Sequence, residues 1–277
     1  MPDGNAGESQ QEPNRLRYRF GLTDAILRSR IRTHRELARN RMTFPFTDVL
    51  SKNLQRVRER IAAACARVGR SPDEVTLIAV TKYAQLDWVR GLIDLGVTDL
   101  GESRPQQLVA RAGQLSLHVR WHQIGHLQRN KADILLPVVS RLHSVDSLRL
   151  IEHLAKSATK LGCRPRLLLE VNVSGEASKD GFKVDELLTA WPLILEHDSI
   201  AIDGLMTMAP LEDDPEAARP TFRGLRELRD RLRETSDGRC VLPDLSMGMS
   251  GDFEIGIEEG ATLIRVGSSL FEGLSHA

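Results

Sequence analysis

The apolar run TLIAV at 76–80 leads through Thr81 to Lys82, one of only seven lysines in a chain whose basic residues are mostly arginine. A lysine amine forms a Schiff base with a carbonyl only after it loses its proton, which requires a pKa below its usual value of ~10.4. Desolvation lowers that pKa, and a position above the apolar core at the mouth of a barrel would supply it. A solvated lysine at a strand end and a nucleophilic amine are therefore both open interpretations.

A second group of residues could hold a phosphate. The stretch SMGMS at 246–250 and the pair Gly267 and Ser268 combine small residues with hydroxyls. Gly267 would let the backbone approach an anion, and Ser268 would open a short helix whose N–H groups point at it. The alternative is that Ser250 and Ser268 are helix caps. If the amine and phosphate interpretations both hold, the ligand carries a carbonyl and a phosphate, as pyridoxal phosphate and phosphorylated sugars do.

The elements that would position these residues follow a repeating order. Short apolar runs alternate with segments of helical periodicity, which indicates parallel strands joined by helices. Eight such units predict a single (β/α)8 barrel of the TIM type, in which chemistry takes place at the C-terminal ends of the strands. A doubly wound open sheet competes, but no Gly-rich dinucleotide turn follows any predicted strand. The predicted strands lie at 75–80, 97–100, 119–124, 141–145, 166–173, 201–208, 243–247 and 262–267.

The N-terminal part of the chain differs from the rest. Residues 1–41 hold nine arginines against five acids, and we expect this extension to be disordered or loosely helical. A transit peptide is disfavoured by the five acids, and a start codon assigned too early, with Met42 as the true start, stays open. Residues 42–277 form the predicted barrel domain. From Asp48 apolar residues recur at helical spacing, which predicts an amphipathic helix ahead of the first strand.

Composition excludes several classes of function. The formal net charge of zero argues against a surface built for nucleic acid or an anionic membrane. The three cysteines, Cys65, Cys163 and Cys240, form no CxxC pair, so neither a disulfide framework nor a zinc site is indicated. No apolar run approaches the ~18 residues of a membrane span. We expect a cytoplasmic protein that handles a small molecule.

Other polar residues have simpler interpretations. His122 and His126 could be acid–base groups, but hydrogen-bonded core or rim positions are more common for such histidines. Asp146 is most simply a helix N-cap. The charges in ESR (102–104) and EASKD (176–180) are predicted to be solvated on loops. No spacing of His, Cys and carboxylates indicates a metal.

Several stretches together resemble one family. They are LIAVTKYAQLDWVRGLIDLGVTDLGESRPQQL, WHQIGHLQRNK, HSVDS, VNVSGEASKDGF, GLMTM and LSMGMSGDFEIGIEEGATLIRVGSSLFEG. From about 48 to 273 the chain resembles the pyridoxal phosphate homeostasis proteins (the YggS/PROSC type). The resemblance implies a barrel like the alanine racemase N-terminal domain, and a protein that binds pyridoxal 5′-phosphate and buffers or delivers it without established catalysis.

The resemblance also implies roles for individual residues. Lys82 aligns with the lysine that forms the internal aldimine, and Arg265 aligns with the arginine beside the pyridine nitrogen. Such a permanent cation disfavours protonation of that nitrogen and so weakens the ring as an electron sink. The phosphate-binding positions correspond to Ser246, Gly267 and Ser268. The full cofactor-binding set implied is Lys82, Asn172, Met206, Ser246, Met247, Arg265, Gly267 and Ser268.

The sequence departs from the family pattern in two places. After the second strand the family usually has GEN, whereas this chain has Ser103 in place of the asparagine. A contact made by the longer amide is therefore in doubt, although serine keeps one donor and an acceptor. Residues 1–41 have no counterpart in the family.

Three functions from different classes are weighed. A non-catalytic carrier in vitamin B6 homeostasis is favoured, with apo forms of pyridoxal phosphate enzymes as recipients and a monomer or weak dimer as its state. An amino-acid racemase is the alternative, but only ten residues follow Gly267 and the only tyrosines are Tyr18 and Tyr83, so we expect neither a second domain nor an opposing base. Losing that base costs a factor of roughly 10²–10⁴ in rate. A class I aldolase acting through Lys82 lacks an evident carboxylate partner.

Overall fold

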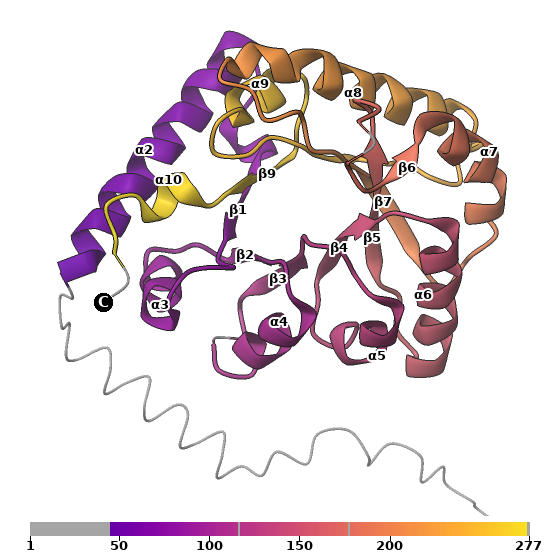
Figure 1. Cartoon of the computed structure of the whole chain (residues 1–277), viewed down its shortest axis with the longest axis horizontal. Coiled ribbons are helices and arrows are strands. Elements are labelled where there is room, and N and C mark those ends of the chain that lie inside the picture. The colour runs from indigo at the N-terminus through magenta and orange to yellow at the C-terminus, as the bar shows by residue number, and fades with distance from the viewer. Residues whose placement is uncertain (1–44, 116, 177, 276–277) are drawn as a thin grey trace, which may run out of the picture. The chain divides into compact units, whose positions relative to one another are not determined.

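The computed structural model describes residues 45–115, 117–176 and 178–275. Within them, parallel strands close into a (β/α)8 barrel, as predicted (Figure 1). The ring runs β4-β3-β2-β1-β9-β8-β7-β5 and closes through the pairing of β4 with β5. Its strands are β1 (Thr76–Val80), β2 (Asp99–Glu102), β3 (Arg120–Gln123), β4 (Arg141–Val145), β5 (Arg166–Asn172), β7 (Ala201–Met206), β8 (Asp244–Ser246) and β9 (Leu263–Val266).

One predicted strand is displaced in the structure, and one strand of the structure was not predicted. The strand expected at 97–100 lies two residues further on, because the chain still turns after Gly96, whose φ of 86° ends the preceding helix. A two-residue strand that the sequence pattern did not reveal, β6 (Phe182–Lys183), pairs with the end of β5. It extends the sheet beside β5 without entering the ring.

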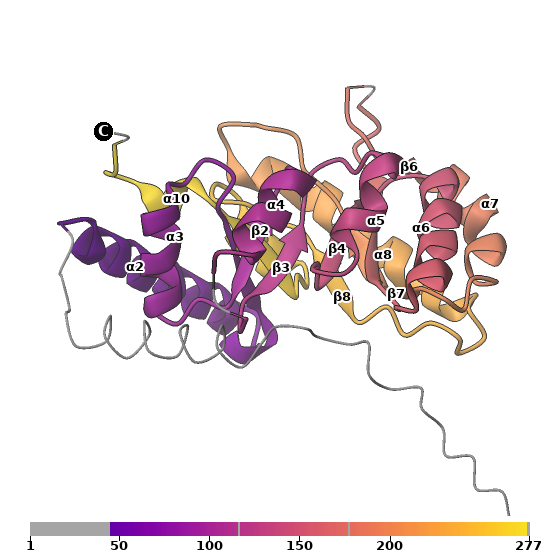
Figure 2. The ribbon, with the colours of Figure 1, turned by 90° about the horizontal axis from the view of Figure 1, so that it is seen from below.

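Helices follow the barrel strands and cover the outside of the ring, as a view from the side also shows (Figure 2). They bury one face each: in α6, Leu150, Leu154 and Ala158 recur at a spacing of four and are almost completely buried. The helices are α3 (Leu86–Asp94), α4 (Pro105–Ala112), α5 (Ala132–Leu135), α6 (Leu148–Leu161), α7 (Val184–Ile194), α8 (Arg219–Glu234), α9 (Phe253–Glu258) and α10 (Ser268–Phe271). Short 3-10 turns are η1 (Pro72–Glu74), η2 (Arg129–Lys131) and η3 (Pro215–Ala218).

The predicted leading helix is α2 (Pro45–Arg67), which runs along α9 and α10. Its apolar residues Leu50 and Leu54 are buried, as their spacing predicted. The side chain of Asn53 donates to the carbonyl of Leu270 over 3.1 Å and to that of Glu272 over 2.9 Å. Helix α2 therefore fixes the end of α10. The predicted extension at 1–41 lies outside the described residues.

No helix in the described ranges is long and apolar enough to span a membrane.

The core has two parts that differ in chemistry. A large apolar core lies between the strands and the helices. Inside the ring, one small apolar cluster comes from four separate strands: Ile78, Leu168, Met206 and Leu263. Because side chains alternate along a strand, the residues two positions further on also face the interior, and several of these are polar. The buried polar groups of the interior include Asp99, His122, Arg141, His143, Glu170, Ser246 and Arg265.

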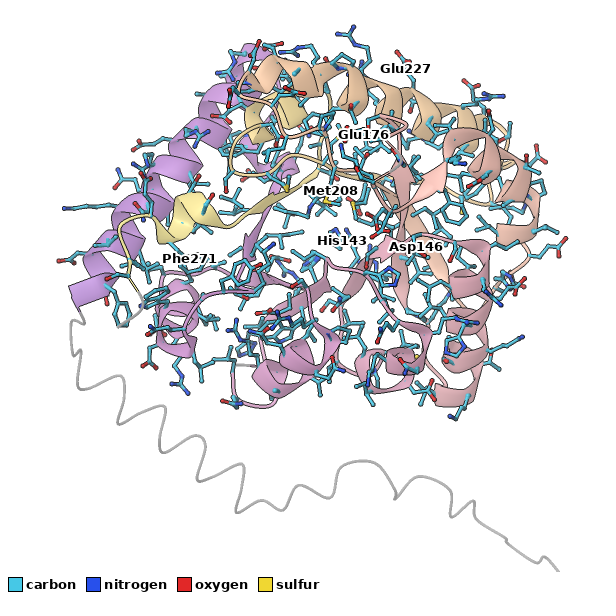
Figure 3. The ribbon with its side chains drawn as sticks, in the orientation of Figure 1. His143, Asp146, Glu176, Met208, Glu227 and Phe271 are labelled. Carbon is cyan, nitrogen blue, oxygen red and sulfur yellow. The ribbon has the colours of Figure 1, made fainter. Side chains whose placement is uncertain are left out.

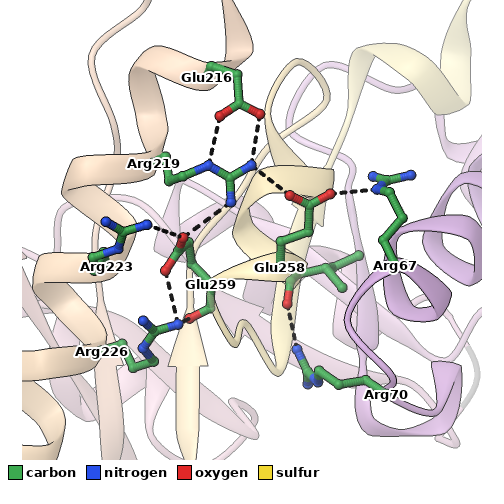
Figure 4. Close-up of polar contacts among 9 residues, drawn as sticks. Arg67, Arg70, Glu216, Arg219, Arg223, Arg226, Glu258 and Glu259 are labelled. Carbon is green, nitrogen blue, oxygen red and sulfur yellow. Dashed lines mark hydrogen bonds and ion pairs between the residues drawn. The ribbon is translucent and has the colours of Figure 1, made fainter.

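Ion pairs join the helices on one side of the barrel (Figure 4). Arg219, just after η3, binds Glu216 through two hydrogen bonds and also reaches Glu258 and Glu259 of the α9 segment. Arg67 of α2 binds the same Glu258 over 2.6 Å. The Glu259 side chain is only 5% exposed. This cluster therefore connects three helices around two acidic residues.

We expect Glu259→Gln to lower the free energy of unfolding by about 2–3 kcal/mol, because it removes the charge that three arginines surround. Those partners are Arg219, Arg223 and Arg226, at 2.9–3.2 Å. The matched control is Glu216→Gln, whose side chain is 56% exposed and should cost less. Urea unfolding at neutral pH measures both. Equal losses in the two variants would contradict the assignment of Glu259 as the buried centre of the cluster.

Candidate functional site

The candidate site lies at the C-terminal ends of the strands, where Lys82 follows β1 by two residues. Its side chain is exposed, and Nζ lies 5.0 Å from the centroid of the Tyr83 ring, itself 72% exposed. The expectation that the apolar core desolvates this amine is therefore wrong for the structure described. The strand ends at Val80, so Lys82 stands on the loop above the core instead of at its edge.

The backbone around Lys82 is held in place by α4. Arg111 donates to the carbonyl of Thr81 over 2.8 Å and to that of Ala84 over 2.6 Å, and Gln107 Nε2 donates to the carbonyl of Lys82 over 3.4 Å. The Arg111 guanidinium needs its two carbonyl acceptors because it is almost fully buried. Lys82 thus combines a fixed backbone with a free side chain.

Glu102 completes this clamp and corrects a prediction. We expected its charge to be solvated, but the side chain is fully buried, accepting a 2.5 Å hydrogen bond from Thr81 Oγ1 and pairing with Arg111. As the last residue of β2, it points toward the helices, opposite to Gly101. Burial raises the pKa of this carboxyl although Thr81 and Arg111 oppose the shift. Its Oε2 atom has no hydrogen-bond partner among the described residues.

Arg265 lies inside the ring on β9 and is 4% exposed. Its Nη1 donates to Ser246 Oγ over 2.6 Å, and its Nη2 donates to the carbonyl of Thr207 over 3.0 Å. Burial lowers the pKa of this guanidinium to about 10, against the opposing effects of Glu170 and Asp252. Arg265 therefore remains a cation at neutral pH.

Of the predicted phosphate positions, Gly267 lies beside Ser250, whereas Ser246 contacts Arg265. Ser250 Oγ accepts from the backbone N–H of Gly267 over 3.2 Å and from that of Ser269 over 3.5 Å. The predicted short helix is present and begins at Ser268, which is exposed. Gly267 is close to β1, since a Cβ atom there would lie 3.3 Å from Val80 Cβ. Two N–H groups thus converge on one oxygen beside the first strand.

The remaining predicted contacts are dispersed. Asn172 is half-buried at the end of β5, where its Nδ2 donates to the carbonyls of Glu176 and Lys179, so it organises the following loop. Met206 is 1% exposed and belongs to the interior cluster. Met247 belongs to the core beneath the helices, so its side chain is not brought to the mouth.

Two acidic or basic groups near Arg265 escaped sequence reasoning. His143 is fully buried within β4, and Figure 3 shows it inside the ring of strands. Glu170 on β5 is 5% exposed, and burial raises its pKa to about 7, with Asp146 and Asp180 adding to the shift and Arg265 opposing it. The only available signal was a polar residue two positions after an interior apolar one, as in Leu168 and Glu170.

The two histidines considered earlier have different surroundings. His122 is a buried, hydrogen-bonded residue, which is the simpler of the two interpretations. His126 lies at the rim, and its Nδ1 is 3.0 Å from Asp146 Oδ2. Asp146 therefore pairs with His126. Of the pair Asp146 and Ser147, which we expected to cap this helix, Ser147 occupies the N-cap position of α6 without a side-chain cap hydrogen bond. In the described part of the chain, no cluster of His, Cys, Asp and Glu could hold a metal.

Known proteins share this architecture. The family model of the alanine racemase N-terminal domain matches residues 48–275. A pyridoxal phosphate homeostasis protein of Aquifex aeolicus is 40% identical over 221 residues, which cover 79% of this chain and 96% of that protein. This chain belongs to the pyridoxal phosphate homeostasis protein family. The predicted resemblance is confirmed.

Further members of the family are similar over the same region. The pyridoxal phosphate homeostasis protein of Pseudomonas aeruginosa is 35% identical over 224 residues, covering 80% of this chain and 94% of that protein. The structure of PipY from Synechococcus elongatus with pyridoxal phosphate bound is 33% identical, with a TM-score of 0.68, and the match covers 76% of this chain and 99% of PipY.

We expect Glu170→Gln to stabilise the protein at pH 8 by about 3 kcal/mol and to have little effect at pH 5. Between the ordinary glutamate pKa of 4.5 and the raised value of about 7, the folded protein holds a proton on Glu170 that the unfolded chain has released, so the wild type loses stability as the pH rises through this window. Urea unfolding at the two pH values measures the difference. The control is Glu227→Gln on the exposed face of α8. A stability difference that does not change with pH would contradict the shift.

Proposed function

We propose that this protein binds pyridoxal 5′-phosphate through Lys82 as a Schiff base and acts as a buffer or carrier of the cofactor in vitamin B6 homeostasis. The observation that carries the proposal is the grouping, at one end of the barrel, of an amine, a buried guanidinium and two converging N–H groups. Membership of the family supports it, as does the pyridoxal phosphate bound to PipY.

The donor set fits the parts of the cofactor. The Lys82 amine suits its aldehyde. The N–H groups of Gly267 and Ser269, which bind Ser250 Oγ, suit a phosphate oxygen, because that hydroxyl already occupies an acceptor position between them. Arg265 suits the ring nitrogen, since a cation disfavours protonation there.

Each residue then has a definite task. Lys82 would hold the cofactor covalently: once its amine has lost one proton, its nitrogen would bond to the aldehyde carbon, and the aldehyde oxygen would leave as water with the two remaining amine protons. Arg265 keeps its charge at neutral pH and limits the electron-withdrawing power that the cofactor's ring supplies when bound. Glu170, close to half protonated at neutral pH, carries only part of a negative charge beside Arg265. Holding the cofactor is favoured over chemistry on an amino acid.

We expect the purified protein, reconstituted with pyridoxal phosphate, to absorb at roughly 410–430 nm, because the cofactor is held as a Schiff base. Lys82→Ala should abolish this band and the covalent adduct that borohydride reduction leaves for mass spectrometry. The control is Lys156→Ala, an exposed lysine on α6. Because the Lys82 side chain is exposed, thermal unfolding of the variant should match the wild type. A wild-type protein that takes up no pyridoxal phosphate would overturn the proposal.

A second measurement separates a carrier from an enzyme. The loaded protein is mixed with the apo form of a pyridoxal phosphate enzyme, and recovery of that enzyme's activity reports transfer. Racemisation is measured in parallel over a panel of amino acids. Transfer without racemisation is the expected result, whereas steady turnover of any amino acid would contradict the carrier role.

A further inference from the structure

A continuous chain of hydrogen bonds crosses the interior of the barrel. Asp99 Oδ1 lies 3.0 Å from His122 Nε2, and His122 Nδ1 lies 2.9 Å from His143 Nε2. His143 Nδ1 lies 2.8 Å from Ser246 Oγ, which also accepts from Arg265 Nη1 over 2.6 Å. The five residues come from five different strands, and each is at most 5% exposed. Water therefore has little access to any link of the chain.

The contacts at the two ends of this chain are consistent with one placement of every proton. A guanidinium only donates hydrogen bonds, so Ser246 Oγ accepts from Arg265, and its own proton can be donated to His143 Nδ1. With Nδ1 accepting, His143 carries its proton on Nε2 and donates to His122 Nδ1. His122 in turn carries its proton on Nε2 and donates to Asp99. All four bonds point the same way, from the cation to the carboxylate.

The Asp99 end leads to the same assignment independently. Burial raises the pKa of Asp99, but hydrogen bonds from His122 and Arg120 outweigh it and hold the pKa well below its usual range. Asp99 is therefore an anion that only accepts. Burial lowers the pKa of both His122 and His143, which keeps the two rings neutral. The Asp99 end thus requires this tautomer in each neutral ring, and the contacts at the Arg265 end are compatible with it.

The chain of hydrogen bonds also runs between the two ends of the barrel. Asp99 is the first residue of β2 and binds Arg120, the first residue of β3, through two hydrogen bonds of 2.8 and 2.5 Å. The Arg120 side chain is 59% exposed, at the N-terminal ends of the strands. Arg265 lies toward the opposite end. Aligned hydrogen bonds polarise one another in a medium of low dielectric constant, so the chain offers a path between Asp99 and Arg265, whose nearer charged neighbours are Glu170 and Asp252.

We propose that His122 and His143 are positioning residues, which relay the charge of Asp99 to Ser246 and Arg265 and so fix the guanidinium that faces the ring nitrogen of pyridoxal phosphate. The part that concerns the cofactor rests on the proposed function. Ser246 serves this relay, because its proton is directed to His143 and its oxygen accepts from Arg265. The phosphate is then held by the N–H groups of Gly267 and Ser269, which now bind Ser250 Oγ. These groups take the phosphate-binding role that the sequence predicted for Ser246.

The first test needs no cofactor. Long-range ¹⁵N–¹H correlation spectra of the histidine-labelled protein at neutral pH report the tautomer of each ring, and His143→Gln and His122→Gln assign the signals. We expect both rings to be neutral with the proton on Nε2. A cationic ring, or a proton on Nδ1 of either residue, would overturn the relay whether or not the protein binds pyridoxal phosphate.

The second test measures the effect on the bound cofactor. His143→Leu removes two hydrogen bonds at similar volume, and we expect it to weaken binding of pyridoxal phosphate about tenfold and to shift its visible absorption maximum. His143→Gln can still accept from Ser246 and donate to His122, and should restore both properties toward wild type. Asp99→Asn keeps an acceptor oxygen but removes the charge, and should shift the absorption maximum alone.

The two tests separate the relay from the proposed function. Thermal unfolding identifies the variants that are folded at the temperature of the binding measurement, and only these are compared. Wild-type binding with an unchanged affinity and absorption maximum in folded His143→Leu and Asp99→Asn would overturn the positioning role. Absence of binding in the wild type overturns the proposed function instead, and the tautomer measurement then decides the relay.

Discussion

A guanidinium enclosed by a barrel needs acceptors on every side, and the burial of Arg265 is the constraint to which much of the interior responds. Leaving such a charge without partners costs several kcal/mol. Ser246 and the carbonyl of Thr207 accept directly from it, while Glu170 and Asp252 are the carboxyl groups that act on its charge. A cluster of four apolar side chains, from β1, β5, β7 and β9, lies inside the ring. The buried cation therefore sits among polar partners above a small apolar cluster.

The helices outside the barrel support the N–H groups around Ser250 through hydrogen bonds, ring stacking and ion pairs. Helix α2 binds the end of α10 through Asn53, and α10 begins at the N–H groups that surround Ser250. Stacked rings of Trp88 and Phe271, with centroids 6.1 Å apart, join α10 to α3. The arginine cluster around Glu258 and Glu259 connects α2, α8 and α9. The segment that follows β9 is thus supported by contacts from α2 and α3.

Local patterns predicted the fold well, because strand and helix periodicities are properties of neighbouring residues. The run before Lys82 and the helix that starts at Ser268 were both found in this way. Contacts between distant strands carry no such signal: His143 meets Ser246 across 103 positions of sequence, and nothing near either residue indicates the other. The predictions of which side chains are buried were wrong in both directions. Glu102 was predicted to be solvated and is enclosed, whereas Lys82 was expected at the edge of the core and is exposed.

The clamp on the Lys82 backbone has a consequence for kinetics. Arg111 fixes the backbone at the base of this side chain, whereas the amine at its tip is exposed and lies over the Tyr83 ring. Ordering such a tip around a ligand costs up to about 2 kcal/mol of conformational entropy, which weakens retention and shortens the residence time of whatever is held. This entropy cost is a disadvantage for an enzyme, which must hold its amine in one orientation. A short residence time is an advantage for a protein that has to release its ligand.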